Sequence, residues 1–162
     1  MDHNISQAVR SIANRYRYYS HYHPLFPILP DIASFAKTYD KCLLLFWTIM
    51  AIGSKRSPSS LNLYLPLSVS VPRLAADLNT TASQSLETIQ ALLILCWWPF
   101  PFQATINDPS WTYCGLATHR ALQFGIHRGR NHSDFVYNSK IDDATSFVYQ
   151  KTWLGCYITN QM

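Results

Sequence analysis

The chain has 162 residues, a length that one ordinary domain fills because most domains span roughly 100–200 residues. Hydrophobic residues make up 48% of it and charged residues only 14%, against about 25% charged residues in a typical soluble chain, and this balance excludes a disordered chain. Because so few charges cannot cover a whole protein surface, we expect an apolar face that meets a further segment or a partner.

A helix is predicted at the start of the chain. Its apolar residues recur at steps of three and four, which places them along one stripe of a helix. They are Ile5, Val9, Ile12, Tyr16 and Tyr19. The helix ends at His23, because the proline that follows disfavours helical backbone in the residue before it.

Three more helices are expected before residue 80. Asp31 caps a short one. Residues 40–53 form a longer helix that is apolar almost all round, so we expect it near the centre of a helical stack. Residues 61–78 contain Pro66 and Pro72, which predict a kinked or broken helix.

Three further helices are predicted in the second half of the chain. Their expected caps are Ser85, Ser110 and one of Asp142 and Asp143. The buried face expected for the second of them contains Trp111, Cys114, Thr118, Ala121, Leu122 and Gly125. In the last helix, Tyr149, Trp153, Cys156 and Tyr157 share one side. No segment shows the sustained alternation of a strand, so the expected fold class is all-α, a helical array.

A dense set of aromatic residues surrounds the loop between the first two of these three helices. It comprises Trp97, Trp98, Phe100, Phe102, Trp111 and Tyr113. Two neighbouring tryptophans cannot both point inward from one helix face, so we expect Trp97 or Trp98 to contact another helix, a ligand or a partner. Core packing and a ligand or interaction surface stay open as interpretations of the set.

Three arginines, Arg120, Arg128 and Arg130, gather with histidines near the carboxyl end of a predicted helix. The helix dipole favours cations at that end, which accounts for the cluster without a ligand. Phosphate contacts are the alternative, but the stretch lacks the interleaved aromatics and long basic runs of a nucleic-acid surface. The net charge of +4 does not by itself indicate nucleic-acid binding.

Catalytic motifs are lacking in the sequence. It contains no Gly-x-Ser-x-Gly elbow, glycine-rich phosphate loop or His-Glu-x-x-His pair. The pair His21 and His23 has no third metal ligand nearby, so a helix-ending turn explains it better than a zinc site. We therefore expect no enzymatic activity, no catalytic residue, and no metal or cofactor held by this chain.

The chain shows no sign of a membrane segment or of export. Its longest apolar runs, residues 42–53 and 91–100, are well short of the ~20 residues that cross a bilayer. The N-terminal residues lack the basic start and apolar core of a secretory signal. The four cysteines lie scattered in apolar stretches, so we expect buried thiols in a reducing compartment and no membrane partner.

Two long segments carry a family resemblance. SLETIQALLILCWWPFP from Ser85 to Pro101, followed by DPSWTYCGLATHRALQFGIHR from Asp108 to Arg128, resembles the middle homology region of fungal zinc-cluster transcription factors. HPLFPIL from His23 to Leu29 and the Lys-Thr-Trp run at residues 151–153 resemble its flanking elements. Within the family, the chain resembles the branch of leucine-biosynthesis and secreted-protease regulators.

The resemblance implies a nuclear protein that controls transcription by RNA polymerase II. Residues 1–22 are expected to form an N-terminal helix or linker, and residues 23–162 the N-terminal part of a larger regulatory domain, truncated at its C-terminus. DNA contacts and zinc are expected only from a domain that this chain lacks, because the family's cluster needs six cysteines with Cys-x-x-Cys pairs and the cysteines here form none.

Two functions are compatible with this resemblance. In the first, helix packing controls the activity of the transcription factor, and the loop between Trp97 and Tyr113 holds a pocket that senses a small-molecule effector. In the second, the chain is a protein-interaction module that docks a coactivator or the rest of its own chain, without ligand or DNA binding.

Overall fold

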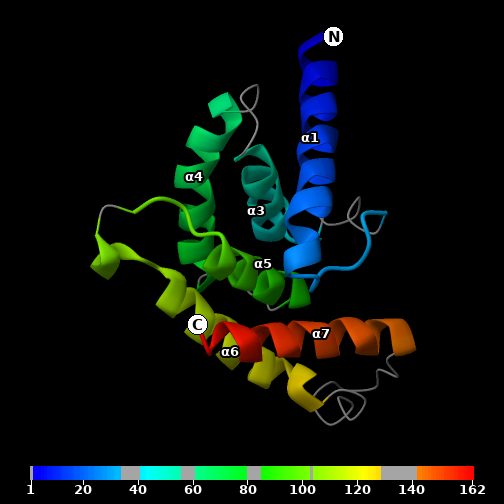
Figure 1. Ribbon diagram of the computed structural model, residues 1–162, viewed down its shortest axis with the longest axis vertical. Coiled ribbons are helices and arrows are strands. Elements are labelled where there is room, and N and C mark those ends of the chain that lie inside the picture. Colours follow the sequence, from blue (N-terminus) through cyan, green and yellow to red (C-terminus); the bar gives the residue numbers. More distant parts are fainter. Residues whose placement is uncertain (1, 34–40, 56–60, 80–84, 103, 129–141) are drawn as a thin grey trace. The chain divides into compact units, whose positions relative to one another are not determined.

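The computed structural model describes residues 2–33, 41–55, 61–79, 85–102, 104–128 and 142–162. Within these ranges all regular secondary structure is helical, which confirms the all-α fold class (Figure 1). The short helix expected after Asp31 falls mostly on residues 34–40, which lie outside the described residues.

The chain divides into two compact units. Unit 1 comprises residues 1–26 and 31–82, and unit 2 comprises residues 27–30 and 83–162. The helices of unit 1 are α1 (Asp2–His21), α3 (Leu43–Ser54) and α4 (Leu61–Ala76), with short 3-10 turns at His23–Leu25 and Asp77–Asn79. Those of unit 2 are α5 (Leu86–Trp97), α6 (Ser110–Phe124) and α7 (Asp143–Thr159), with a 3-10 turn at Thr105–Asn107. The division at residue 22 expected from the sequence stays a prediction.

The centre of unit 1 is α3, the helix expected to be apolar almost all round. It lies between α1 and α4 (Figure 1) and contacts both. Most of its residues are buried, including Leu45, Ile49 and Ile52. Near its end, Gly53 lies against the backbone of Asn14, and a Cβ atom at position 53 would collide with the Asn14 carbonyl. The missing side chain is therefore what allows α1 and α3 to approach so closely.

This close approach decides which face of α1 is buried. Ile12 and Tyr16, which belong to the stripe predicted from helical spacing, are 56% and 67% exposed. Asn14 and Tyr18 are fully buried instead. Position 14 must face α3 because Gly53 is the place where the two backbones meet, so Ile12 and Tyr16 of the predicted stripe lie off the buried face of α1.

A kinked or broken fourth helix was expected, and of these two alternatives the break is absent. α4 continues through Pro66 and Pro72. A proline inside a helix removes one backbone hydrogen bond and costs about 3 kcal/mol, but neither proline is buried. The buried stripe of this segment consists of Tyr64, Leu67, Val71, Ala75 and Leu78. Burying one large apolar side chain contributes roughly 1.5–3 kcal/mol, so this stripe outweighs the two lost bonds and keeps the helix continuous.

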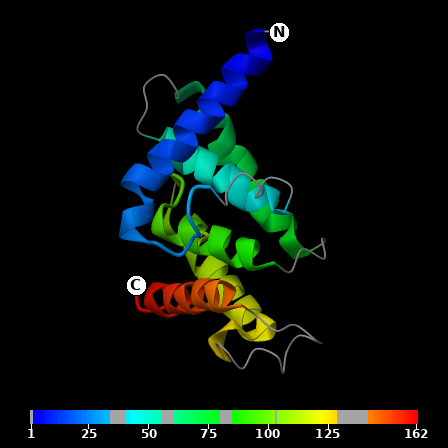
Figure 2. The same cartoon turned by 90° about the vertical axis from the view of Figure 1, so that its right-hand side faces the viewer.

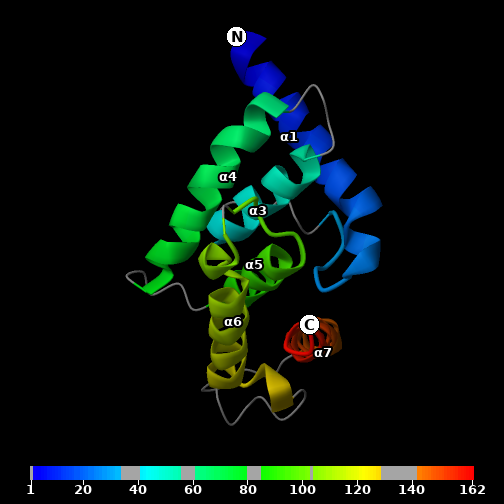
Figure 3. The same cartoon turned by 60° about the vertical axis from the view of Figure 1, so that its left-hand side comes forward.

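In unit 2, α6 and α7 both contact α5, and they also contact each other. Figure 2 and Figure 3 show that α7 crosses α6 rather than running parallel to it. Two expected caps are confirmed. The Ser85 hydroxyl accepts the Thr88 N–H at 3.2 Å and begins α5, and the Asp142 carboxylate accepts the Thr145 N–H at 3.2 Å and begins α7.

One buried amide joins three segments of unit 2. The Nε2 atom of Gln90 donates to the carbonyl of Ile28 at 3.1 Å and to the Thr152 hydroxyl at 3.1 Å. Gln90 is 1% exposed, so these bonds satisfy a polar group that would otherwise be costly to bury. They attach residues 27–30 to α5 and α7, which explains why this short segment belongs to unit 2.

The start of α6 differs from the sequence-based expectation. Ser110 is not its cap. Pro109 occupies the cap position without a side-chain bond, and the carboxylate of Asp108 accepts the backbone N–H of Ser110 at 3.0 Å. A hydrogen bond from a backbone N–H to the Asp side chain two residues earlier forms a tight local turn. This turn begins α6 in place of the expected serine cap.

The buried face expected for α6 is confirmed at Ala121 and Gly125 and differs at Trp111 and Leu122. In α6, Tyr113, Ala117 and Ala121 are buried, while Trp111 is 87% exposed and Leu122 is also exposed. Small alanines allow α6 to pack closely against α5, which turns the larger side chains outward. In α7 the buried side is formed by Ser146, Thr152, Gly155, Cys156 and Thr159. Tyr157, which was expected on the same side of the helix as Cys156, is exposed, whereas Cys156 is buried.

Two glycine substitutions are expected to act in opposite directions on the free energy of unfolding. Gly53→Ala should destabilise the chain by about 1–3 kcal/mol, because the new methyl group pushes α3 away from Asn14. Gly115→Ala should stabilise it by about 0.5–1 kcal/mol, because nothing lies near the added atom and alanine favours the helical backbone of α6. Chemical denaturation of both variants measures the difference, and equal effects would contradict this account of Gly53.

Candidate functional site

The paired tryptophans lie half-buried at the end of α5. Their ring centroids are 6.3 Å apart, with the ring planes at 49°. The indole Nε1 of Trp97 donates to the hydroxyl of Thr159 at 3.0 Å. Trp97 therefore contacts a second helix, α7, which is one of the three contacts expected for this pair.

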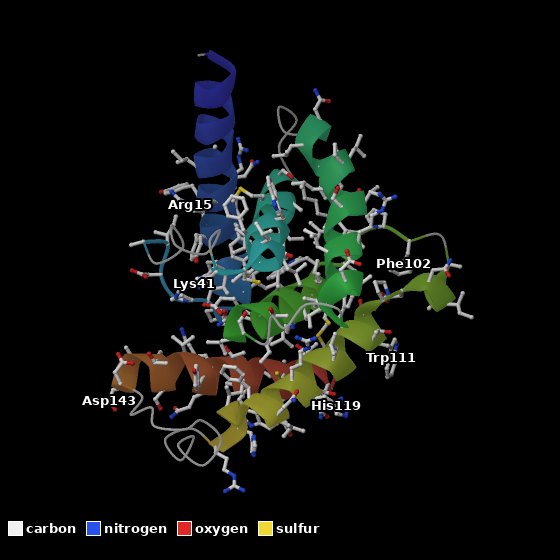
Figure 4. The ribbon with its side chains drawn as sticks, turned by 180° about the vertical axis from the view of Figure 1, so that it is seen from behind. Arg15, Lys41, Phe102, Trp111, His119 and Asp143 are labelled. Atoms are coloured by element: carbon white, nitrogen blue, oxygen red, sulfur yellow. The ribbon has the colours of Figure 1, made fainter. Side chains whose placement is uncertain are left out.

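The other aromatic residues of the predicted set do not form one surface. Tyr113 is buried, and burial raises the pKa of its phenol. Phe100 is half-buried and Phe102 is exposed. Trp111 projects outward from the first turn of α6, after the loop that carries Phe102 (Figure 4). The set divides between the interior of unit 2 and its surface.

A cavity of about 360 Å³ opens where the end of α5, the start of α6 and the end of α7 meet. Its lining residues are Cys96, Pro99, Asp108, Ser110, Trp111, Cys114, Gly115, Thr159, Asn160 and Met162. Cavities of roughly 300–1,000 Å³ accommodate small organic molecules. Trp111 is the member of the predicted aromatic set that lines it, so the cavity adjoins the loop in which a pocket was expected.

Hydrogen bonds inside unit 2 hold the walls of this cavity together. The Thr159 hydroxyl accepts the Trp97 indole and donates to the Gly155 carbonyl at 2.8 Å. The amide nitrogen of Asn160 donates to the Thr118 hydroxyl at 2.7 Å and to the Cys156 carbonyl at 2.8 Å. These bonds connect α7 to both α5 and α6, so the geometry of the cavity depends on the packing of all three helices.

Burial raises the pKa of three thiols of unit 2, and two of them, Cys96 and Cys114, line the cavity. Burial is the main cause that raises the pKa of Cys96 and of Cys156 to about 12. The pKa of Cys114 is also raised by burial. The Cys96 thiol donates to the Ser110 carbonyl at 3.4 Å. A thiol in this state is a poor nucleophile and a poor metal ligand.

The predicted arginine cluster is described only in part. Arg120 lies half-buried in α6, and Arg128 is exposed just beyond its end. Arg130 lies outside the described residues. The helix ends at Gly125, which has a positive φ of 77° and closes the last turn. Arg128 therefore follows a helix carboxyl end, where the helix dipole favours a cation.

Two further observations concern metal and membrane. In the described part of the chain, no group of three or more His, Cys, Asp or Glu side chains is placed to hold a metal ion. Among the helices that the structure describes, none combines the length and the apolar character that a membrane span requires.

Sequence reasoning missed most of the cavity's polar wall. Asp108 is visible in the sequence as part of an Asp-Pro-Ser helix start, which is a signal for its role in the turn before α6. No local pattern points to Thr159 or Asn160, because their position at the cavity depends on how α7 crosses α6. Gln90 lies within the family-like SLETIQALL run, yet its partners Ile28 and Thr152 are both distant in the sequence.

The described residues form an all-α array with a cavity between helix ends. The sequence pattern of the fungal specific transcription factor domain matches residues 16–161. The chain belongs to this family.

The relatives it resembles are transcription factors. The chain is 35% identical over 143 residues to the putative transcription factor SEF1 of Eremothecium gossypii, covering 86% of this chain and 13% of the relative. It is 33% identical over 142 residues to the SEF1 of Kluyveromyces lactis, covering 86% and 12%. It is 25% identical over 157 residues to the regulatory protein LEU3 of Saccharomyces cerevisiae, covering 86% and 17%.

The chain thus spans about an eighth of the length of the first two relatives. No solved structure matches it. The family and the leucine-regulator branch expected from the sequence are confirmed by these similarities.

The half-buried Cys96 and the buried Cys156 should resist alkylation in the folded chain. At about pH 8, iodoacetamide should leave Cys96 and Cys156 unmodified, because a pKa of about 12 leaves almost no thiolate to react. After denaturation in urea all four cysteines should react within the same time, which serves as the control. Peptide mass spectrometry measures the modification, and fast labelling of native Cys156 would contradict the burial of its thiol.

Proposed function

We propose that this chain is part of the regulatory domain of a nuclear transcription factor that acts with RNA polymerase II. In this proposal a small-molecule effector binds the cavity beside Trp111 and changes the packing of α5, α6 and α7. The observation that carries it is the cavity of about 360 Å³ walled by the ends of these three helices. DNA binding and its zinc cluster would be supplied by another domain, since the four cysteines here form no Cys-x-x-Cys pair.

The mechanism is a population shift between two helix packings. A ligand changes such an equilibrium only if it binds one packing more tightly than the other. A ligand in this cavity touches α6 through Ser110 and Trp111 and α7 through Thr159 and Asn160. The ligand therefore makes most contacts when the start of α6 and the end of α7 lie at one particular distance from each other. In this mechanism the domain acts without any catalytic step.

Filling the cavity should abolish ligand binding. In Gly115→Phe the new side chain starts in open space and at a residue that lines the cavity, so it occupies the cavity without displacing backbone. Small-molecule fragments that bind the unmodified chain in ligand-observed NMR should lose at least tenfold in affinity for this variant. Gly115→Ala is the matched control and should bind them normally.

The same experiment has a clear negative result. If no fragment binds the unmodified chain, or if fragments bind Gly115→Phe with unchanged affinity, the cavity is not an effector site. Circular dichroism of Gly115→Phe establishes that the helical content is retained, so that loss of binding reports on the filled cavity.

A second candidate function is protein docking, and the exposed face of α7 favours it. This helix buries small or polar residues, whereas Phe147, Leu154, Tyr157 and Ile158 are exposed. We refer to these four side chains as the α7 apolar face. Exposed apolar patches of this kind mark protein contacts, so a coactivator or the rest of the transcription factor's own chain would cover it.

Docking through the α7 apolar face should be visible in the chain alone. The unmodified chain should self-associate at high concentration, and Leu154→Lys should reduce this association several-fold while leaving the free energy of unfolding within about 0.5 kcal/mol, as exposed substitutions do. Size-exclusion chromatography with light scattering measures the association. A soluble monomer at every concentration would argue against this second function.

A further inference from the structure

The cavity wall carries a charge of one sign. Asp108 is the charged residue among the residues that line it, and none of them is Lys, Arg or His. One oxygen of the Asp108 carboxylate accepts the Ser110 N–H at 3.0 Å. A carboxylate has room for several hydrogen bonds, so its second oxygen can accept a bond from a ligand.

Three polar side chains of the wall, Cys96, Thr159 and Asn160, use their donors within the protein, whereas acceptors remain. The Thr159 proton bonds the Gly155 carbonyl. The Asn160 nitrogen bonds the Cys156 carbonyl and the Thr118 hydroxyl. The Cys156 carbonyl can only accept a hydrogen bond, so the Asn160 side-chain atom that bonds it must be the amide nitrogen. The Asn160 side-chain oxygen is therefore left as an acceptor. The Cys96 thiol likewise donates to a backbone carbonyl, that of Ser110.

The helix ends at the cavity agree with this pattern. The start of α6 attracts an anion, but the Asp108 carboxylate already supplies one there. The end of α7, with Thr159 and Asn160, presents the negative end of a helix dipole, which favours a cation. The Asp108 carboxylate and the end of α7 therefore both favour positive charge in a ligand that lies between them.

The remaining walls are apolar. Pro99 and the indole of Trp111 line the opening, and Trp111 is 87% exposed, so a ligand would cover a large aromatic surface that water now contacts. An indole also attracts a cation placed over its face. A suitable ligand combines a hydrogen-bond-donating cation with an apolar body.

We infer that the cavity binds a small organic amine, whose ammonium group donates to Asp108 and the Asn160 oxygen and whose apolar part covers Trp111. This inference rests on the proposed function, since it assigns a ligand class to the same cavity. It also implies selectivity. A ligand of the same shape that carries a carboxylate in place of the ammonium group is repelled by the Asp108 carboxylate. No Lys, Arg or His lines the cavity to compensate, so the cavity rejects this ligand.

Three probes of nearly equal shape test this assignment. 2-Phenylethylammonium, 2-phenylethanol and 3-phenylpropionate carry a positive, a neutral and a negative group on the same aromatic body. Isothermal titration at low salt should show that the full chain binds the ammonium at least tenfold more tightly than the alcohol. The carboxylate should not bind detectably, and added salt should weaken ammonium binding.

Substitutions then locate the charge that is responsible. Asp108→Asn keeps an oxygen for the Ser110 N–H, so the start of α6 is preserved, but it removes the negative charge and should lower ammonium affinity about tenfold. Asp143→Asn is the matched control. It removes the same charge at the opposite end of α7 (Figure 4) and should leave the affinity unchanged.

The outcomes separate this inference from the proposed function. If the alcohol or the carboxylate binds as tightly as the ammonium, or if Asp108→Asn binds like the unmodified chain, the amine assignment is wrong while the cavity remains a binding site. If none of the three probes binds and the fragment panel also finds no ligand, both the assignment and the effector site are overturned.

Discussion

The structure of unit 2 depends on the burial of a helix that has no polar face. Residues 88–95 of α5 are buried without interruption, so other segments must cover it on every side. The buried polar residues Thr88 and Gln90 bond within the protein, which removes the cost of placing them there. The helices that pack on α5 therefore need small side chains on the sides that face it, so that they can approach it closely.

α6 and α7 meet this demand with small residues. α6 packs through Ala117 and Ala121, and α7 through glycine, cysteine and hydroxyl residues. The buried hydroxyls of Thr152 and Thr159 bond the carbonyls four residues earlier in their own helix, so they enter the interior without leaving an unpaired polar group. Several large apolar side chains of both helices consequently face outward, and the α7 apolar face and exposed Trp111 arise from this packing.

The cavity arises from the same arrangement. α6 and α7 cross on α5 and meet near one pair of ends, where the turn at Asp108 and the last residues of α7 leave a space between them. Its wall combines one carboxylate, spare acceptors and an indole. The side chains that close the helix ends are therefore also the side chains that determine which ligand chemistry the space accepts. In the proposed function, ligand binding and helix packing are coupled because both use the same residues.

The sequence alone predicted the all-α class, the approximate helix limits and the family. Helical spacing, proline positions and cap residues such as Ser85 and Asp142 act over a few neighbouring residues, so they can be recognised without the fold. The family resemblance depended on the order of motifs along the chain, which is also a property of the sequence.

Only the tertiary structure decided which face of each helix is buried and where a cavity forms. Ile12, Trp111 and Tyr157 are apolar residues at regular spacing, yet they are exposed. The prolines of α4 broke no helix because a buried stripe outweighed their local cost. These outcomes depend on the total area buried against other helices and on close backbone contacts such as Gly53 with Asn14, and such long-range terms have no signature in a local pattern.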